Sequence, residues 1–130
     1  MQKILKFVEK SLLVQDFKIH DFKTGTEFAY IKLEILLKNS SKVYIREFVN
    51  AKQRKYSLHW IIDTQTEIRW DNSPHHKSIR THPHHVHFNQ NVFPSECSDP
   101  VTILAWIESL LTNREELAPE IIIREIRKLR

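Results

Sequence analysis

Apolar residues recur along the chain with two periods, and the local period predicts the element. Over residues 2–13 they fall at helical spacing with lysines outside the apolar stripe, which predicts an amphipathic first helix. Over residues 27–37 they alternate with polar residues, which predicts a strand with one buried face. Shorter alternations bounded by turn-forming residues predict further strands at 17–20, 42–50, 56–63 and 66–71. The four longer strands follow one another through short connections and predict an antiparallel meander.

The region after these strands predicts a long loop. Pro74 ends regular strand pairing, because proline has no N–H to donate to a ladder. Four of the five prolines lie between Pro74 and Pro100, so we expect an irregular segment over residues 72–100. A loop of that length inside a small domain is more often functional than idle.

Two helices are expected at the end of the chain. Asp99 followed by Pro100 is a helix-start signal, and Pro119 opens a last helix with isoleucines on one side and basic residues on the other. The whole pattern predicts a single α+β domain over residues 1–130. It has an N-terminal helix, a four- to five-stranded antiparallel sheet, a His/Pro-rich loop and C-terminal helices over about residues 100–130.

Composition narrows the classes of function. Apolar runs stay far below the roughly 20 consecutive residues of a membrane-spanning helix, and the N-terminus lacks the apolar centre of a secretory signal, so we expect a cytoplasmic protein without a membrane. The only glycine, Gly25, excludes glycine-rich phosphate loops. Acidic neighbours of the single Cys97 raise the pKa of its thiol, which argues against a catalytic thiolate. The net charge of +4 favours a polyanionic partner.

Histidines concentrate in one segment. Six of the eight lie within 13 residues, namely His75, His76, His82, His84, His85 and His87. His59 lies upstream on the strand that precedes residues 66–71. If Thr64 and Gln65 form a two-residue turn, His59 lies opposite Trp70 and Trp60 opposite Arg69, and a slip of one residue would move His59 to the other face.

Two chemistries suit this segment. Neutral imidazoles with a carboxylate bind Zn or Mn, and the ligands would then come from Asp71, His75, His84, His85 and His87, although the spacing matches no established zinc signature. Alternatively, cleavage of RNA by its own 2′-OH needs a base, an acid and a cation near the phosphate. Histidines together with arginine or lysine supply all three without a metal.

Basic and aromatic residues nearby predict an RNA-binding surface. The candidates are Lys52, Arg54, Lys55, Trp70, Asn72, Lys77 and Arg80. Each of these residues also has a purely structural interpretation. Trp70 would then be a core residue, and the lysines would form a solvated face or protect a sheet edge. The histidines would stabilise turns.

The sequence RWDNSPHH at residues 69–76, followed by THPHHVH at 81–87, resembles the signature of the TumE-type toxins of bacterial and archaeal toxin–antitoxin pairs. Tyr56-x-x-His59 and Val92-x-Pro94-Ser95 extend the resemblance, whose signature region covers about residues 56–95. His82 departs from the pattern, which has an apolar or aromatic residue there. The helix from Pro119 lies outside the likeness.

The resemblance implies a toxin encoded beside a small antitoxin, its protein partner. We expect an endoribonuclease that acts on RNA without a metal cofactor, and the alternatives are a metal-dependent nuclease or hydrolase and a non-enzymatic inhibitor. The expected catalytic residues are His59, Arg69, Asp71, His75, His76, His84, His85 and His87. The outline of helix, meander and helix also resembles the RelE-like ribonuclease toxins, which is a fold-level analogy. A homodimer is compatible with all of these readings.

Overall fold

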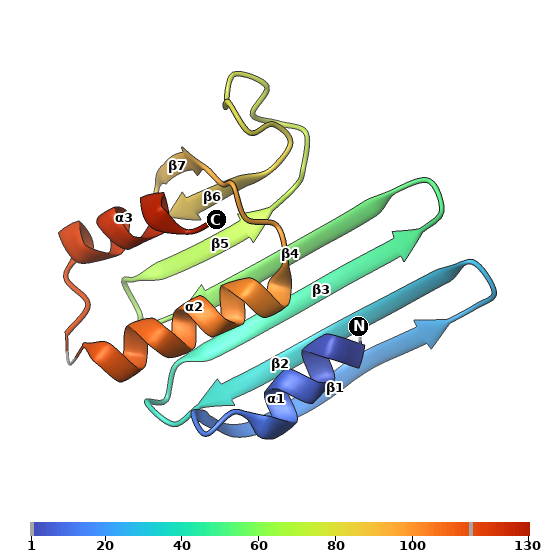
Figure 1. The fold of residues 1–130 in the computed structure, drawn as a ribbon, viewed down its shortest axis with the longest axis horizontal. Coiled ribbons are helices and arrows are strands. Elements are labelled where there is room, and N and C mark those ends of the chain that lie inside the picture. The colour runs from blue at the N-terminus through green and yellow to red at the C-terminus, as the bar shows by residue number, and fades with distance from the viewer. Residues whose placement is uncertain (1, 115) are drawn as a thin grey trace.

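An antiparallel sheet of seven strands forms the body of the computed structural model, which describes residues 2–114 and 116–130. The strands lie side by side in chain order: β1 (Val14–Thr24), β2 (Phe28–Leu37), β3 (Lys42–Asn50), β4 (Arg54–Ile61), β5 (Glu67–Asp71), β6 (His85–Phe88) and β7 (Asn91–Pro94). The helices are α1 (Gln2–Lys10), α2 (Pro100–Asn113) and α3 (Pro119–Lys128). The predicted α+β class and meander are confirmed, with more strands than the expected four to five (Figure 1).

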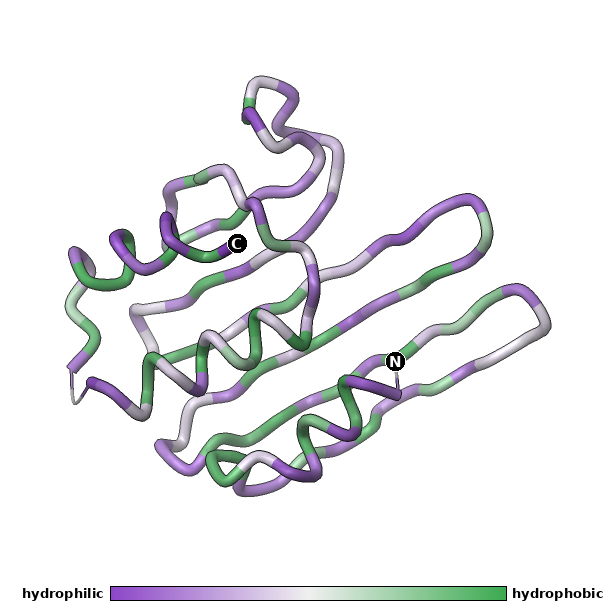
Figure 2. The backbone as a smooth tube through the Cα atoms, in the orientation of Figure 1, coloured by the Kyte–Doolittle hydropathy of each residue, from purple (hydrophilic) through white to green (hydrophobic). Residues whose placement is uncertain are grey.

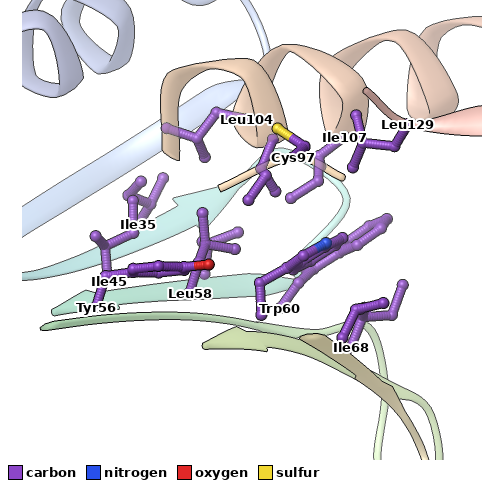
Figure 3. Close-up of a cluster of buried hydrophobic side chains, with 14 of the residues drawn as sticks. Ile35, Ile45, Tyr56, Leu58, Trp60, Ile68, Cys97, Leu104, Ile107 and Leu129 are labelled. Carbon is purple, nitrogen blue, oxygen red and sulfur yellow. The ribbon is translucent and has the colours of Figure 1, made fainter. Parts of the chain in front are cut away.

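Helices cover one face of the sheet. In Figure 1, α1 and α2 run in front of the strands, and α3 lies near β6 and β7. Apolar side chains that alternate along β2 to β6 meet the buried residues of these helices in one core. Figure 3 shows part of that core, with Leu104 and Ile107 of α2 above Leu58 and Trp60 of β4. The sheet is therefore buried on one face, as the alternation over β2 predicts.

The opposite face of the sheet carries the polar positions of the same strands. The segment between β5 and β6, residues 72–84, extends beyond the strand ends and is mainly hydrophilic (Figures 1 and 2). No helix in the described part of the chain is long and apolar enough to cross a membrane.

The predicted loop over residues 72–100 was wrong in its second half, where β6 and β7 form a hairpin. The strand signal was hidden because His85 and His87 count as polar, although His85 is buried like an apolar residue. Asn89 at the tip has a φ of 53°, a left-handed conformation that asparagine tolerates well.

Two other boundaries also differ from expectation. The first strand spans Val14–Thr24 instead of 17–20, and it continues through residues 21–24, where a turn was expected to end it. It is an edge strand with exposed polar residues, so its hydrophobic alternation is weak. The first helix ends at Lys10 instead of residue 13.

The register of β4 and β5 was predicted one residue away from the one observed. His59 pairs with Arg69, and Leu58 pairs with Trp70. The turn is longer than the expected two residues, because the Ile62 amide donates to the Thr66 carbonyl at 2.9 Å. Trp70 therefore faces the core, and His59 shares the open face with Arg69.

Candidate functional site

Strand register brings the histidines of β6 beside charged residues of β5 on the open face. Asp71 pairs with His85, and Arg69 pairs with His87. His59 of β4 lies opposite Arg69 in the next strand. Directly opposed residues in an antiparallel sheet project to the same face, so these five side chains occupy two adjacent cross-strand rows.

A third histidine reaches the same place from the loop before β6. The ring of His76 lies 4.7 Å from that of His85 and 5.3 Å from that of His87, between ring centroids. The rings of His85 and His87 are 4.8 Å apart, and all three pairs meet edge to face. One ring nitrogen from each of the three lies within 4.8 Å of the others. We call this group the histidine trio.

Asp71 is the anion beside the trio. Its Oδ1 lies 3.0 Å from His85 Nε2 and its Oδ2 lies 3.5 Å from His87 Nε2. The Arg69 side chain donates to Oδ2 at 3.1 Å, and the Ser73 backbone amide donates to Oδ1 at 3.0 Å. Burial opposes ionisation of this carboxyl, but the Ser73 amide, the charge of His85 and the Arg69 bond outweigh it and lower the pKa of Asp71. The carboxylate is therefore charged and held in place.

His85 is the most enclosed member of the trio, with a side chain 1% exposed. Its Nδ1 lies 2.9 Å from the carbonyl oxygen of Pro83. A carbonyl can only accept, so Nδ1 carries a proton and donates it to Pro83, which leaves Nε2 as the ring nitrogen nearest to Asp71. Among the described residues this Nε2 has no hydrogen-bond partner, because Asp71 Oδ1 approaches it closely but outside hydrogen-bonding direction.

His87 is accessible from the open face, with a side chain 19% exposed. Burial lowers the pKa of His87, and the positive charge of Arg69 lowers it further, whereas Asp71 opposes both. The neutral form of this imidazole is thereby favoured.

The remaining predicted histidines lie apart from the trio. His84 Nδ1 is 2.9 Å from the Tyr56 hydroxyl, and the two rings stack with centroids 5.8 Å apart. Burial lowers the pKa of His84, as do the charges of Arg54 and His85. His59 Nε2 lies 3.1 Å from a Glu67 carboxylate oxygen. His75 is exposed.

A hollow of about 530 Å³ adjoins the trio on the same face. Its lining is aromatic and cationic, and Arg69 and Asp71 belong both to this wall and to the surroundings of the trio. The ten lining residues are Tyr30, Arg46, Phe48, Lys55, Tyr56, Ser57, Arg69, Asp71, Asn72 and Ser73. The hollow opens to solvent and offers flat apolar rings together with positive charge.

Three of the predicted binding residues make contacts within the fold. Trp70 is fully buried and packs edge to face on Trp106 of α2 at 5.6 Å, so it cannot stack on a base. Arg54 donates to Glu47 at 2.7 Å and to the Ser98 carbonyl at 2.6 Å. Asn72 accepts from the Tyr56 amide at 3.0 Å and donates to the Arg54 carbonyl at 2.7 Å, which extends the pairing of β4.

The other predicted binding residues differ in their distance from the hollow. Lys55 lines it, whereas Lys52 lies outside the residues that form its wall. Lys77 is exposed on the loop before β6. Arg80 on the same loop pairs with Glu96.

Sequence reasoning missed the two aromatic residues that β2 and β3 add to the wall, Tyr30 and Phe48. Both sit at outward positions and pair with each other, and Arg46 of β3, which also lines the wall, pairs with Ser57. The alternation of those strands marks them as outward-facing. The order of strands in the sheet, which places them beside Asp71, is a tertiary feature.

The fold and site define a class: a small α+β protein with helices on one sheet face and a histidine–aspartate site on the other. A family model described as Toxin TumE matches residues 4–118, and the chain belongs to that family. No curated protein and no solved structure matches the chain. The resemblance drawn from the histidine motifs is confirmed at the level of the family, and the family makes a toxin role and an antitoxin partner the expected setting of the site.

Proposed function

We propose that this toxin cleaves RNA, with the histidine trio and Asp71 as its reaction centre and the adjoining hollow as its RNA-binding surface. The observation behind the proposal is that the hollow and the trio have two neighbouring residues in common. Arg69 and Asp71 border the hollow and also lie against the trio, so a nucleotide in the hollow brings its phosphate beside imidazole nitrogens.

The hollow has the chemistry that single-stranded RNA requires. Bases stack on aromatic rings, which Tyr30 and Phe48 supply, and phosphates pair with cations, which Arg46 and Lys55 supply. Arg46 and Lys55 form no ion pair with any other described residue, so their charges are free for a ligand.

Cleavage through the 2′-OH needs proton transfer and charge stabilisation at one phosphate. The 2′-oxygen attacks phosphorus while its proton passes to a base, and the leaving 5′-oxygen takes a proton from an acid, which leaves a 2′,3′-cyclic phosphate. His76 and His87 are half-buried and accessible for these roles, whereas the buried His85 acts on them through Asp71. Arg69, which pairs with Asp71 at 3.1 Å, supplies a cation at this centre.

The test uses the purified toxin with a mixed-sequence RNA of several hundred nucleotides, in chelator and separately with Zn²⁺ or Mn²⁺. Cleavage products that end in cyclic phosphate and disappear in His76→Ala support the proposal. His75→Ala is the matched control, because His75 is exposed and outside the trio. Absence of cleavage under every condition, with toxicity retained in cells, would overturn it in favour of a non-enzymatic inhibitor.

A further inference from the structure

The histidine trio has the geometry to bind a metal ion as well as to transfer protons. Three ring nitrogens within 4.8 Å of one another, beside a carboxylate, form a donor set that divalent metal ions bind in proteins. We propose that His76, His85 and His87 bind one divalent transition-metal ion, with Asp71 adding negative charge at the same site. This rests on the proposed function and changes one part of it: with an ion bound, His76 and His87 are ligands, and the ion with a bound water would supply the charge stabilisation and the base at this centre. The binding test needs no RNA.

The strongest argument is the position of His85 Nε2. The Nδ1 of this ring donates to the Pro83 carbonyl at 2.9 Å, so Nε2 is the ring nitrogen left for a ligand, and it lies 3.0 Å from Asp71 Oδ1. This Nε2 has no hydrogen-bond partner among the described residues, and the side chain is 1% exposed, so it is a buried polar atom that lacks a partner. A bound cation would be that partner.

The neighbours of His85 fit a metal ion as that cation, because one ion can take a lone pair from each of the three rings. The edge-to-face packing of the rings, at interplanar angles of 63°, 71° and 76°, fits nitrogens that converge from different directions.

The surroundings of the trio resemble those of metal-binding histidines. Such histidines usually donate their second ring N–H to a backbone carbonyl or a carboxylate, which fixes the tautomer, and His85 does so to Pro83. Asp71 is itself oriented by Arg69 and by the Ser73 amide. A tetrahedral zinc site holds its imidazole nitrogens at about 2.0 to 2.1 Å from the ion, so the trio closes by roughly an ångström on binding.

His76 reaches the site from residues 72–84, whereas His85 and His87 belong to β6. A bound ion therefore ties this segment to the sheet at its open face. Because Arg69 and Asp71 border both the trio and the hollow, a phosphate bound in the hollow would lie close to the ion.

The experiment titrates metal-free protein with Zn²⁺, and separately with Mn²⁺, by isothermal titration calorimetry, with stoichiometry checked by equilibrium dialysis. We expect one ion per chain. The double variant H76A/H87A should lose at least about 100-fold in affinity, and Asp71→Asn about 10- to 100-fold. The matched control is H75A/H82A, which removes two exposed histidines of the same segment and should stay within about threefold of the native affinity.

Folding of each variant is checked by the near-ultraviolet circular dichroism of the core tryptophans. If H76A/H87A does not fold, the single variant His76→Gln replaces it, and metal should raise the melting temperature of the native protein but not of this variant. Equal losses in H76A/H87A and H75A/H82A, or no binding to the native protein, would overturn the metal site. RNA cleavage that persists in chelator would leave the proposed function standing after such a result.

Discussion

At the scale of single residues, the hydroxyl of Tyr56 shows how the structure separates His84 from the trio. Tyr56 is 3% exposed, and its hydroxyl lies 2.9 Å from His84 Nδ1. Burial raises the pKa of Tyr56, so the phenol keeps its proton throughout the range in which histidines titrate. The contact therefore holds the chain just before β6, and its contribution to the free energy of unfolding can be measured.

Tyr56→Phe should lower the free energy of unfolding by about 1 kcal/mol, because it removes one partly buried hydrogen bond. Urea denaturation followed by tryptophan fluorescence measures this. Tyr44→Phe is the control, since Tyr44 is only half-buried and lies on the open face opposite His59. Equal effects of the two substitutions would mean that the bond to His84 contributes nothing specific.

Cys97 is the second residue whose environment makes a prediction. The side chain is 4% exposed in the core beneath α2, and burial raises the pKa of the thiol (Figure 3). Both effects reduce the thiolate available at pH 8. Labelling with Ellman's reagent at that pH should be at least about 1000-fold slower in the native protein than in guanidinium, because it must wait for opening of the core. Comparable rates would show that this part of the core is open.

At the scale of elements, the start of α2 was predicted from sequence and carries a measurable contribution to stability. Asp99 accepts from the Thr102 amide at 3.3 Å and from its hydroxyl at 2.8 Å, and Pro100 occupies the first turn. Asp99→Ala should cost about 1 kcal/mol in thermal or urea unfolding, because an orphan amide loses its cap.

Asp99→Asn provides the comparison, because asparagine caps helices about as well as aspartate does. A loss of only a few tenths of a kcal/mol is expected for it. If Asn cost as much as Ala, the charge of Asp99 near the helix N-terminus would matter more than the hydrogen bonds.

Elements with a strong periodicity of apolar residues were predictable from the sequence, whereas β6, which has a polar residue at a buried position, was not. The alternation in β2 reports one buried face, and Pro100 and Pro119 mark the starts of the last two helices. β6 was not predicted because a histidine, His85, fills a buried position where an apolar residue is usual. The Asn89-Gln90 tip also lacks the glycine that usually signals a tight hairpin.

The candidate site was predictable as a set of residues more than as a geometry. Sequence density pointed to the histidines, and the DN-x-PHH motif placed Asp71 among them. Selection of His76, His85 and His87 from six candidates depends on the β5–β6 register and on the path of residues 72–84. The local pattern does not give either of them, because residues 72–84 join β5 to β6 without a tight turn that would fix the register.

At the scale of the whole molecule, RNA binding should depend on where the positive charges lie more than on the net charge. The net charge of +4 is modest, and lysines occur on both sides of the sheet. Lys6 and Lys10 lie on α1, whereas Arg46 and Lys55 line the hollow on the opposite, open face. If RNA binds to the open face, removal of two charges there must differ from removal of two charges on α1.

The prediction compares R46Q/K55Q with K6Q/K10Q, which change the net charge equally. Binding of a fluorescent single-stranded RNA is followed by anisotropy over a series of salt concentrations. Each lost phosphate contact should reduce the slope of log affinity against log salt by about 0.7, so R46Q/K55Q should lose about 1.4 and K6Q/K10Q almost none. Equal changes in both would mean that RNA responds to overall charge and that the hollow is not its binding surface. A selective loss in R46Q/K55Q would place the RNA backbone on the face where Arg69, Asp71 and the trio meet.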